Sequence, residues 1–140
     1  MKSKTMSIFF AFAFAGLFLT APASGADVIK IGFSGPLSGG AAKYGKNCEA
    51  GMIMAIEEIN VKGGITVVGK KYKIEVVSLD DRYKPDLTVQ NARRMTSLDN
   101  VQAVFCTHSG GILAMMNFNE TDGFIVMGYT THPKTVEIGN

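Results

Sequence analysis

Hydroxyl, glycine and tyrosine residues gather in three short segments of this chain, each directly after an apolar stretch. The segments are residues 34–44, 107–111 and 129–132. None of them contains a carboxylate, so each offers hydroxyl and backbone N–H groups as hydrogen-bond donors. Donors of this kind hold a small anion, such as the carboxylate of a metabolite, without any catalytic group. The three segments therefore predict a binding site rather than a catalytic one.

The most specific of these signals is the sequence Ser109-Gly110-Gly111. It follows one predicted strand and opens a predicted helix. As the N-cap of that helix, Ser109 would leave the next backbone N–H groups free to face a ligand. The alternative is a purely structural cap, which the motif taken alone favours. The agreement with the other two segments favours ligand binding instead.

Two catalytic alternatives begin from the same segments. Residues 40–47 (GAAKYGKN) resemble a phosphate-binding loop but lack the Ser or Thr that would hold magnesium, so nucleotide binding is not predicted. Ser109 beside His108 suggests a hydrolase, yet no G-x-S-x-G motif is present. We predict that the protein is not an enzyme, and a small exported serine hydrolase is the alternative from that class.

The sequence also contains residues that could bind a metal or act as an acidic pair. His108 and His132 lie in neighbouring predicted loops, but a metal site requires more ligands nearby than the sequence supplies. The pattern therefore predicts polar loop histidines, with no metal and no cofactor. Asp80 and Asp81 follow a predicted strand, and a strand-end turn explains them better than catalysis does.

Stretches of strand length alternate with helical patterns along the chain. The predicted strands are residues 28–33, 72–76, 101–105 and 124–127, with a short extended piece at 65–68. The predicted helices are residues 42–61, 85–98 and 109–118. This alternation predicts an α/β fold, with a parallel sheet and helices on both of its faces. Because such sheets bind ligands outside the carboxyl ends of their strands, the three polar segments must meet there.

Residues 1–26 have the pattern of a cleavable export signal. Lys2 and Lys4 precede an apolar stretch at residues 8–19, and small residues lead to a cleavage point after Ala26. The apolar stretch is shorter than the roughly 20 residues that a membrane-spanning helix needs. The two lysines account for the formal net charge of +2, so residues 27–140 are near neutral. This predicts a periplasmic protein without membrane insertion after cleavage, and without a nucleic-acid partner.

The two cysteines, Cys48 and Cys106, are far apart in the sequence and fit no zinc-binding spacing. In an oxidising compartment they could form a disulfide that closes a long loop. The alternative is two buried free thiols, which we favour because sequence alone gives no pairing geometry.

Three stretches resemble the periplasmic branched-chain amino acid binding proteins of ABC transporters. They are IKIGFSGPLSGGAAKYG, AGMIMAIEEINVKGGI and VVSLDDRYKPDLTVQNARRM. The resemblance implies two αβ lobes that close on a solute, with residues 27–140 forming the first part of lobe one and the second lobe absent. It also implies capture of a small amino acid by its α-carboxylate and α-ammonium, for delivery to the membrane subunits of an ABC permease. A truncated and poorly functional fragment is therefore expected.

The resemblance also assigns roles to particular residues. Ser109 and Thr131 would bind the α-carboxylate, and a backbone carbonyl near Tyr129 or Thr130 would accept from the α-ammonium. Tyr44 would pack against the side chain of the ligand. The predicted ligand-binding set is Tyr44, Ser109, Gly110, Tyr129, Thr130 and Thr131.

Several departures from the family pattern leave the ligand open. Tyr83 replaces the cysteine of the family's Asp-Asp-x-Cys turn, which removes the usual disulfide partner of the loop cysteine. The loop CTHSGG differs from the family's run of serines, so its register is open by one residue, and GYTTHP differs from the commoner version of the later loop. Amides, urea and other small amino acids remain alternatives to leucine-like ligands. A periplasmic ligand sensor is the second function in the binding class.

Overall fold

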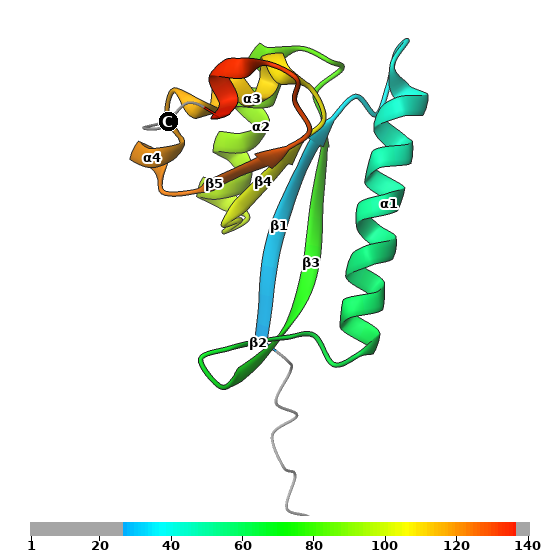
Figure 1. Cartoon of the computed structure of the whole chain (residues 1–140), viewed down its shortest axis with the longest axis vertical. Coiled ribbons are helices and arrows are strands. Elements are labelled where there is room, and N and C mark those ends of the chain that lie inside the picture. The colour runs from blue at the N-terminus through cyan, green and yellow to red at the C-terminus, as the bar shows by residue number, and fades with distance from the viewer. Residues whose placement is uncertain (1–26, 137–140) are drawn as a thin grey trace, which may run out of the picture.

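The computed structural model describes residues 27–136 and places five strands in one sheet with helices on both faces (Figure 1). The strands are β1 (Asp27–Gly35), β2 (Ile65–Val67), β3 (Lys70–Asp80), β4 (Ala103–Cys106) and β5 (Ile125–Gly128). The helices are α1 (Ala42–Val61), α2 (Pro85–Leu98), α3 (Ser109–Met116) and α4 (Asn119–Asp122), with a 3-10 turn η1 (Pro133–Val136). The export signal predicted for residues 1–26 lies outside the described residues.

The strands lie in the order β2-β3-β1-β4-β5. β1 pairs in parallel with β3 from Asp27 opposite Tyr72 to Gly35 opposite Asp80, and the β1–β4 and β4–β5 pairs are also parallel. β2 instead pairs with β3 in an antiparallel hairpin. The α/β class and the helices on both faces are confirmed. The sheet is mixed, because a two-residue turn between β2 and β3 is too short for a parallel crossover.

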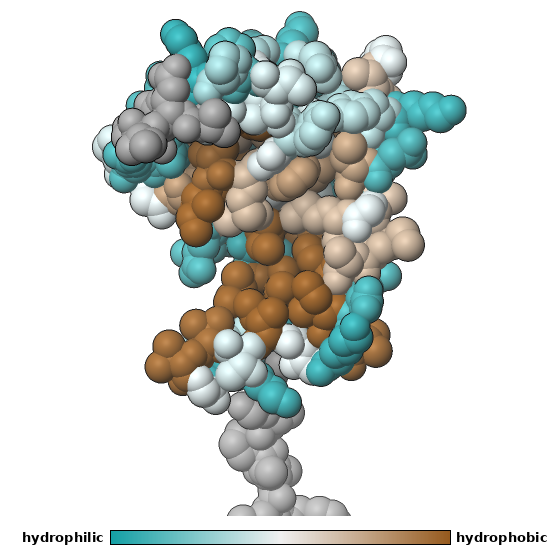
Figure 2. All heavy atoms as spheres, in the orientation of Figure 1, coloured by the Kyte–Doolittle hydropathy of each residue, from teal (hydrophilic) through white to brown (hydrophobic). Residues whose placement is uncertain are grey.

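The hydrophobic core lies between the sheet and helices α2 and α3, while α1 covers the other side of β1 and β3 (Figure 1). The buried members of this core are Ala92, Met95, Val101, Val104, Cys106, Ile112, Met115 and Phe124. Helix α1 buries fewer apolar side chains than α2 or α3. Ile56 is buried there, but Ala55 is exposed. Figure 2 accordingly shows hydrophobic side chains over the first half of β1 and the β2–β3 hairpin, and polar ones around the carboxyl ends of the strands.

Helix α1 begins in close contact with the chain that leaves β1. A Cβ atom on Gly45 would lie 2.1 Å from the backbone oxygen of Pro36, so only glycine allows this approach. The contact brings the first turn of α1, with Tyr44, to the carboxyl edge of the sheet. The carboxyl ends of β1, β3, β4 and β5 meet at this edge, where the three polar segments begin.

Candidate functional site

Asp80 anchors the first polar segment at this edge. Its Oδ1 atom accepts hydrogen bonds from the backbone N–H groups of Leu37 (2.8 Å), Ser38 (3.3 Å) and Arg82 (2.9 Å), and its Oδ2 atom accepts one from the Ser38 hydroxyl. Burial acts to raise the pKa of Asp80, but these hydrogen bonds outweigh it and lower that pKa. The strand-end turn predicted for Asp80 and Asp81 is confirmed. This turn brings two carboxylates to the carboxyl ends of the strands, where the three predicted polar segments contain none.

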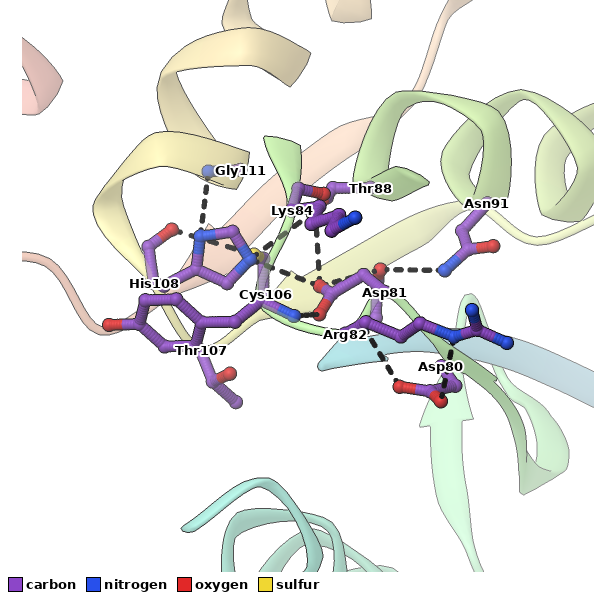
Figure 3. Close-up of polar contacts among 12 residues, drawn as sticks. Asp80, Asp81, Arg82, Lys84, Thr88, Asn91, Cys106, Thr107, His108 and Gly111 are labelled. Atoms are coloured by element: carbon purple, nitrogen blue, oxygen red, sulfur yellow. Dashed lines mark hydrogen bonds and ion pairs between the residues drawn. The ribbon is translucent and has the colours of Figure 1, made fainter. Parts of the chain in front are cut away.

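Asp81 is fully buried and joins several segments (Figure 3). Its Oδ2 atom lies 3.1 Å from the Ser34 hydroxyl, 3.0 Å from the Thr88 hydroxyl and 3.1 Å from His108 Nε2. Its Oδ1 atom accepts from the backbone N–H of Tyr83 at 2.8 Å. Burial acts to raise the pKa of Asp81, but the hydrogen bonds, with that from His108 foremost, lower it. This carboxylate therefore has donors on both of its oxygens.

His108, rather than Ser109, is the N-cap of α3. It has an extended backbone (φ −145°, ψ 144°), and its Nδ1 atom accepts a hydrogen bond from the Gly111 N–H at 3.0 Å. The prediction that Ser109 caps this helix is wrong, because α3 begins at Ser109 itself, one residue earlier than that role requires. His108 lies in the loop before α3, where the sequence placed it, and its ring is buried there. Tyr83 covers one face of the imidazole, with ring centroids 4.6 Å apart.

Two contacts have opposite effects on the protonation of His108: Asp81 at Nε2 favours the charged ring, and the Gly111 N–H at Nδ1 requires the neutral one. Burial acts to lower the pKa of His108, but the hydrogen bond to Asp81 and the nearby Cys106 thiol raise that pKa to about 9. An imidazolium, however, has no lone pair at Nδ1 and could not accept from Gly111. The Gly111 N–H points its positive end at Nδ1 and so opposes a second proton there, which counteracts the rise in pKa. We assign the capped structure to the neutral imidazole with its proton on Nε2, because the Gly111 contact has hydrogen-bond geometry.

Asp81, Cys106 and His108 also form a candidate metal-binding group, with ligand atoms within 4.8 Å of one another. A metal at Nε2 would need a proton on Nδ1, and that proton would face the Gly111 N–H. Both Asp81 oxygens already accept hydrogen bonds. The group is thus better described as a closed hydrogen-bond network than as a metal site. Cys48 and Cys106 are both free thiols in the structure.

The second and third polar segments meet through their hydroxyl groups. The Thr130 hydroxyl donates to the Ser109 hydroxyl at 2.9 Å, and it accepts from the His132 N–H at 3.1 Å. Ser109 therefore faces Thr130, whereas both nitrogens of the His108 ring contact Asp81 and Gly111. Within the described residues no hydrogen bond joins the Ser109 hydroxyl to a histidine ring, which leaves the hydrolase alternative without its base.

Tyr44 joins the first polar segment to the second. Its hydroxyl donates to the backbone oxygen of Thr107 at 2.8 Å. The pKa of Tyr44 is raised, mainly by burial and by the Cys48 thiol, with smaller contributions from the phenols of Tyr83 and Tyr129. Tyr83 and Tyr129 thus both lie near Tyr44 at the carboxyl edge, and each of the three tyrosines keeps a large exposed surface. This aromatic group was not predicted, because Tyr83 lies in the turn after β3.

The structure brings most of the predicted ligand-binding residues to one edge. Ser109 and Gly110 lie in the first turn of α3, and their backbone N–H groups have no hydrogen-bond acceptor within residues 27–136. Thr131 is exposed beside Thr130, but no contact links it to Ser109 within the described residues. Thr107 lies in the second polar segment but is not in the predicted ligand-binding set, and its buried hydroxyl has no hydrogen-bond partner within the described chain. An unpaired buried hydroxyl at this edge is consistent with a polar ligand.

Comparison with known proteins agrees with this geometry. Residues 28–139 match the family model described as periplasmic binding protein. The chain belongs to the periplasmic binding protein family. It is 37% identical over 97 residues to the leucine-, isoleucine-, valine-, threonine-, and alanine-binding protein of Pseudomonas aeruginosa, a match that covers 69% of this chain and 24% of that relative. The chain thus spans about a quarter of the length of that curated relative.

Two solved structures of this family show the same fold. The branched-chain amino acid transporter substrate-binding protein LivJ of Streptococcus pneumoniae, in complex with isoleucine, superposes with a TM-score of 0.69 and 30% identity, over 78% of this chain and 31% of LivJ. A solute binding protein of an ABC transporter from Rhodopseudomonas palustris, in complex with 3,4-dihydroxybenzoic acid, gives a TM-score of 0.60 and 28% identity, over 73% of this chain and 27% of its own. The resemblance to branched-chain amino acid binding proteins is therefore confirmed. Among the described helices, none has the length and apolarity needed to span a membrane.

Proposed function

We propose that this protein captures a small amino acid in the periplasm and delivers it to the membrane subunits of an ABC permease. Residues 1–26 direct its export and are removed, and residues 27–140 form part of the first lobe of the binding protein. No bond of the solute is made or broken. Affinity comes from charge-assisted hydrogen bonds and from closure of the protein around the solute.

The proposal rests on the contacts between the three polar segments at the carboxyl ends of the strands. Tyr44 contacts Thr107, and Ser109 contacts Thr130, so that donors from residues far apart in sequence face the same region. The carboxylates of Asp80 and Asp81 accept from internal donors and are not free to take a cationic ligand. The remaining donors are the Ser109 and Gly110 N–H groups at the N-terminus of α3, which favours an anionic group.

Within this proposal, Ser109, Gly110 and Thr131 contact the α-carboxylate. A backbone carbonyl of Tyr129 or Thr130 accepts from the α-ammonium, and the Tyr44 ring packs against the side chain of the solute. The leucine-binding and isoleucine-binding relatives support a branched-chain amino acid as the ligand.

An aromatic carboxylic acid is the second candidate ligand. The three tyrosines at the carboxyl edge provide ring faces against which an aromatic solute could stack. A relative in complex with 3,4-dihydroxybenzoic acid shows that this family includes such binding. The carboxylate contacts at α3 would be the same for both ligand classes.

Isothermal titration of the intact protein tests the proposal. The ligands are L-leucine, L-isoleucine, L-valine and 3,4-dihydroxybenzoate, with isopentylamine as a matched ligand that lacks the carboxylate of leucine. We expect saturable binding of one carboxylate ligand and no heat from isopentylamine. Binding of isopentylamine as tightly as leucine, or steady hydrolysis of ester or amide substrates, would contradict the proposal.

A further inference from the structure

Asp81 connects elements that are distant in the sequence. Its carboxylate accepts hydrogen bonds from Ser34 at the end of β1, from Thr88 in α2 and from His108 before α3. Its backbone N–H donates to Gly35 O at 3.0 Å. A fully buried carboxylate with this many donors keeps one orientation, because each alternative would leave a buried polar group unpaired.

His108 extends this connection to the first turn of α3. Its Nε2 atom faces Asp81 at 3.1 Å, its Nδ1 atom accepts from the Gly111 N–H at 3.0 Å, and its backbone oxygen accepts from the Ile112 N–H at 3.2 Å. Tyr83 covers one face of the ring. Figure 3 shows the imidazole between the Asp81 carboxylate and Gly111. The position of the α3 N-terminus is thus tied to the turn that follows β3.

We propose that Asp81 is a positioning residue for the ligand site, which acts by holding the His108 imidazole so that Nδ1 caps α3 and the Ser109 and Gly110 N–H groups face the ligand. The hydrogen bond to Asp81 keeps the proton of the neutral ring on Nε2, and this leaves the lone pair of Nδ1 for Gly111. The role in ligand binding rests on the proposed function. The role in capping α3 does not.

The same geometry makes capping depend on the protonation of His108. The titratable groups that face its ring are Asp81 at the end of β3, Tyr83 in the following turn and Cys106 in β4. Helix α2 contributes only the neutral Thr88 hydroxyl, at 3.4 Å from Nε2, and α3 contributes the Gly111 N–H. A second proton on Nδ1 removes the acceptor of the cap but leaves the hydrogen bond to Asp81 in place. Capping and protonation of this ring are therefore mutually exclusive.

A double-mutant cycle read by amide hydrogen exchange tests the positioning role. Asp81→Asn weakens the acceptor of His108, and we expect exchange at the Gly111 N–H to become about tenfold faster. His108→Asn replaces the imidazole with another good N-cap that is too short to reach Asp81, so exchange should stay within roughly twofold of the wild type. In the His108→Asn background, Asp81→Asn should then leave Gly111 unchanged.

Two references make the cycle decisive. Asp86→Asn alters an exposed carboxylate in the first turn of α2 and should leave Gly111 exchange as in the wild type. The Ile74 N–H, in the core strand β3, reports global unfolding, so its rate corrects for any overall loss of stability. An equal effect of Asp81→Asn on Gly111 in both backgrounds would show that Asp81 acts only through overall stability, and it would overturn the proposal.

A pH titration of the wild-type protein gives an independent answer if a variant fails to fold. The ¹⁵N shifts of the His108 ring report which nitrogen carries a proton. We expect protection of Gly111 while Nδ1 is unprotonated, and loss of that protection together with protonation of Nδ1. Full protection of Gly111 with a protonated Nδ1 would contradict the assignment.

Ligand titrations then separate the positioning role from the proposed function. With the solute that the wild-type protein binds among L-leucine, L-isoleucine, L-valine and 3,4-dihydroxybenzoate, we expect Asp81→Asn to weaken binding roughly threefold to tenfold. Unchanged affinity despite a lost cap would remove Asp81 from ligand positioning. If the wild-type protein binds none of the four, the proposed function fails, and the exchange cycle still decides the capping role.

Discussion

The Thr130 hydroxyl donates a hydrogen bond to the Ser109 hydroxyl over 2.9 Å, between residues that are 21 positions apart in the sequence. This bond joins the loop after β5 to the first turn of α3. The Ser109 oxygen is the acceptor, so its own proton remains available to a ligand. The pair therefore places a donor beside the unpaired N–H groups of Ser109 and Gly110.

Replacement of Ser109 by alanine should weaken solute binding. A hydrogen bond to a charged group contributes about 1.5–3 kcal/mol, so the dissociation constant should rise roughly tenfold to a hundredfold in the intact protein. Isothermal titration measures the change. Ser97→Ala is the matched control, because the Ser97 hydroxyl bonds only to its own helix. Equal affinity of Ser109→Ala and Ser97→Ala would remove Ser109 from the site.

Replacement of Thr130 by valine tests the contact between the two loops. Valine keeps the shape of the side chain but cannot donate to Ser109 or accept from the His132 N–H. The loss of these neutral hydrogen bonds should weaken binding by roughly twofold to tenfold. Thr130→Ser keeps the hydroxyl and should restore affinity close to that of the wild type. A serine variant as weak as the valine variant would show that the hydroxyl contact is not responsible.

Replacement of Tyr44 by phenylalanine separates its ring from its hydroxyl. The ring surface that would pack on a solute is kept, but the hydrogen bond to Thr107 O is lost. We expect stability to fall by about 1 kcal/mol and affinity to fall only a few-fold, as measured by urea unfolding and by titration. Tyr72→Phe is the control, because Tyr72 lies opposite Asp27 at the far end of the sheet. If Tyr44→Phe lost as much affinity as Tyr44→Ala, the contribution of Tyr44 to solute binding would come from its hydroxyl and not from its ring.

The lowered pKa of Asp81 predicts a loss of stability in acid. A carboxyl group whose pKa is lower in the folded than in the unfolded protein stabilises the fold above its ordinary value of 3.8, and this contribution disappears as the pH falls through the folded value. The free energy of unfolding of the wild type should therefore decrease below about pH 4 more steeply than that of Asp81→Asn. Urea unfolding between about pH 2 and pH 7 measures both slopes. Parallel slopes would show that Asp81 is not a source of the acid sensitivity.

Two glycines of α1 should respond in opposite directions to alanine. A Cβ at Gly45 would overlap the backbone oxygen of Pro36, and the forced shift should cost about 1–3 kcal/mol of stability. A Cβ at Gly51 meets no atom within 4 Å, and alanine there should stabilise the helix by about 0.5–1 kcal/mol. Thermal unfolding of the two variants distinguishes these outcomes. A stable Gly45→Ala protein would contradict the close contact between α1 and the end of β1.

The sequence alone predicted the order of the elements and the edge at which the polar segments meet. Both follow from local signals, because strand and helix periodicities are visible within a few residues and parallel strands place their carboxyl ends together. Tyr44 and Ser109 follow the ends of parallel strands, so the same rule places them both at the carboxyl ends of the sheet. The antiparallel β2–β3 hairpin could also have been found, since Val68-Gly69 is a two-residue connection between the short extended piece at 65–67 and the alternating strand that starts at Lys70.

The tertiary structure alone decided how the site is held together. Asp81 bonds to Ser34 and His108, which lie 47 and 27 residues away, and no local pattern indicates such partners. The identity of the α3 cap depended on the same contacts, because serine is a preferred N-cap and histidine is not, and here the His108 ring is held by Asp81. Local periodicity thus determined where the loops lie, and long-range hydrogen bonds in the buried interior determined which atoms they present.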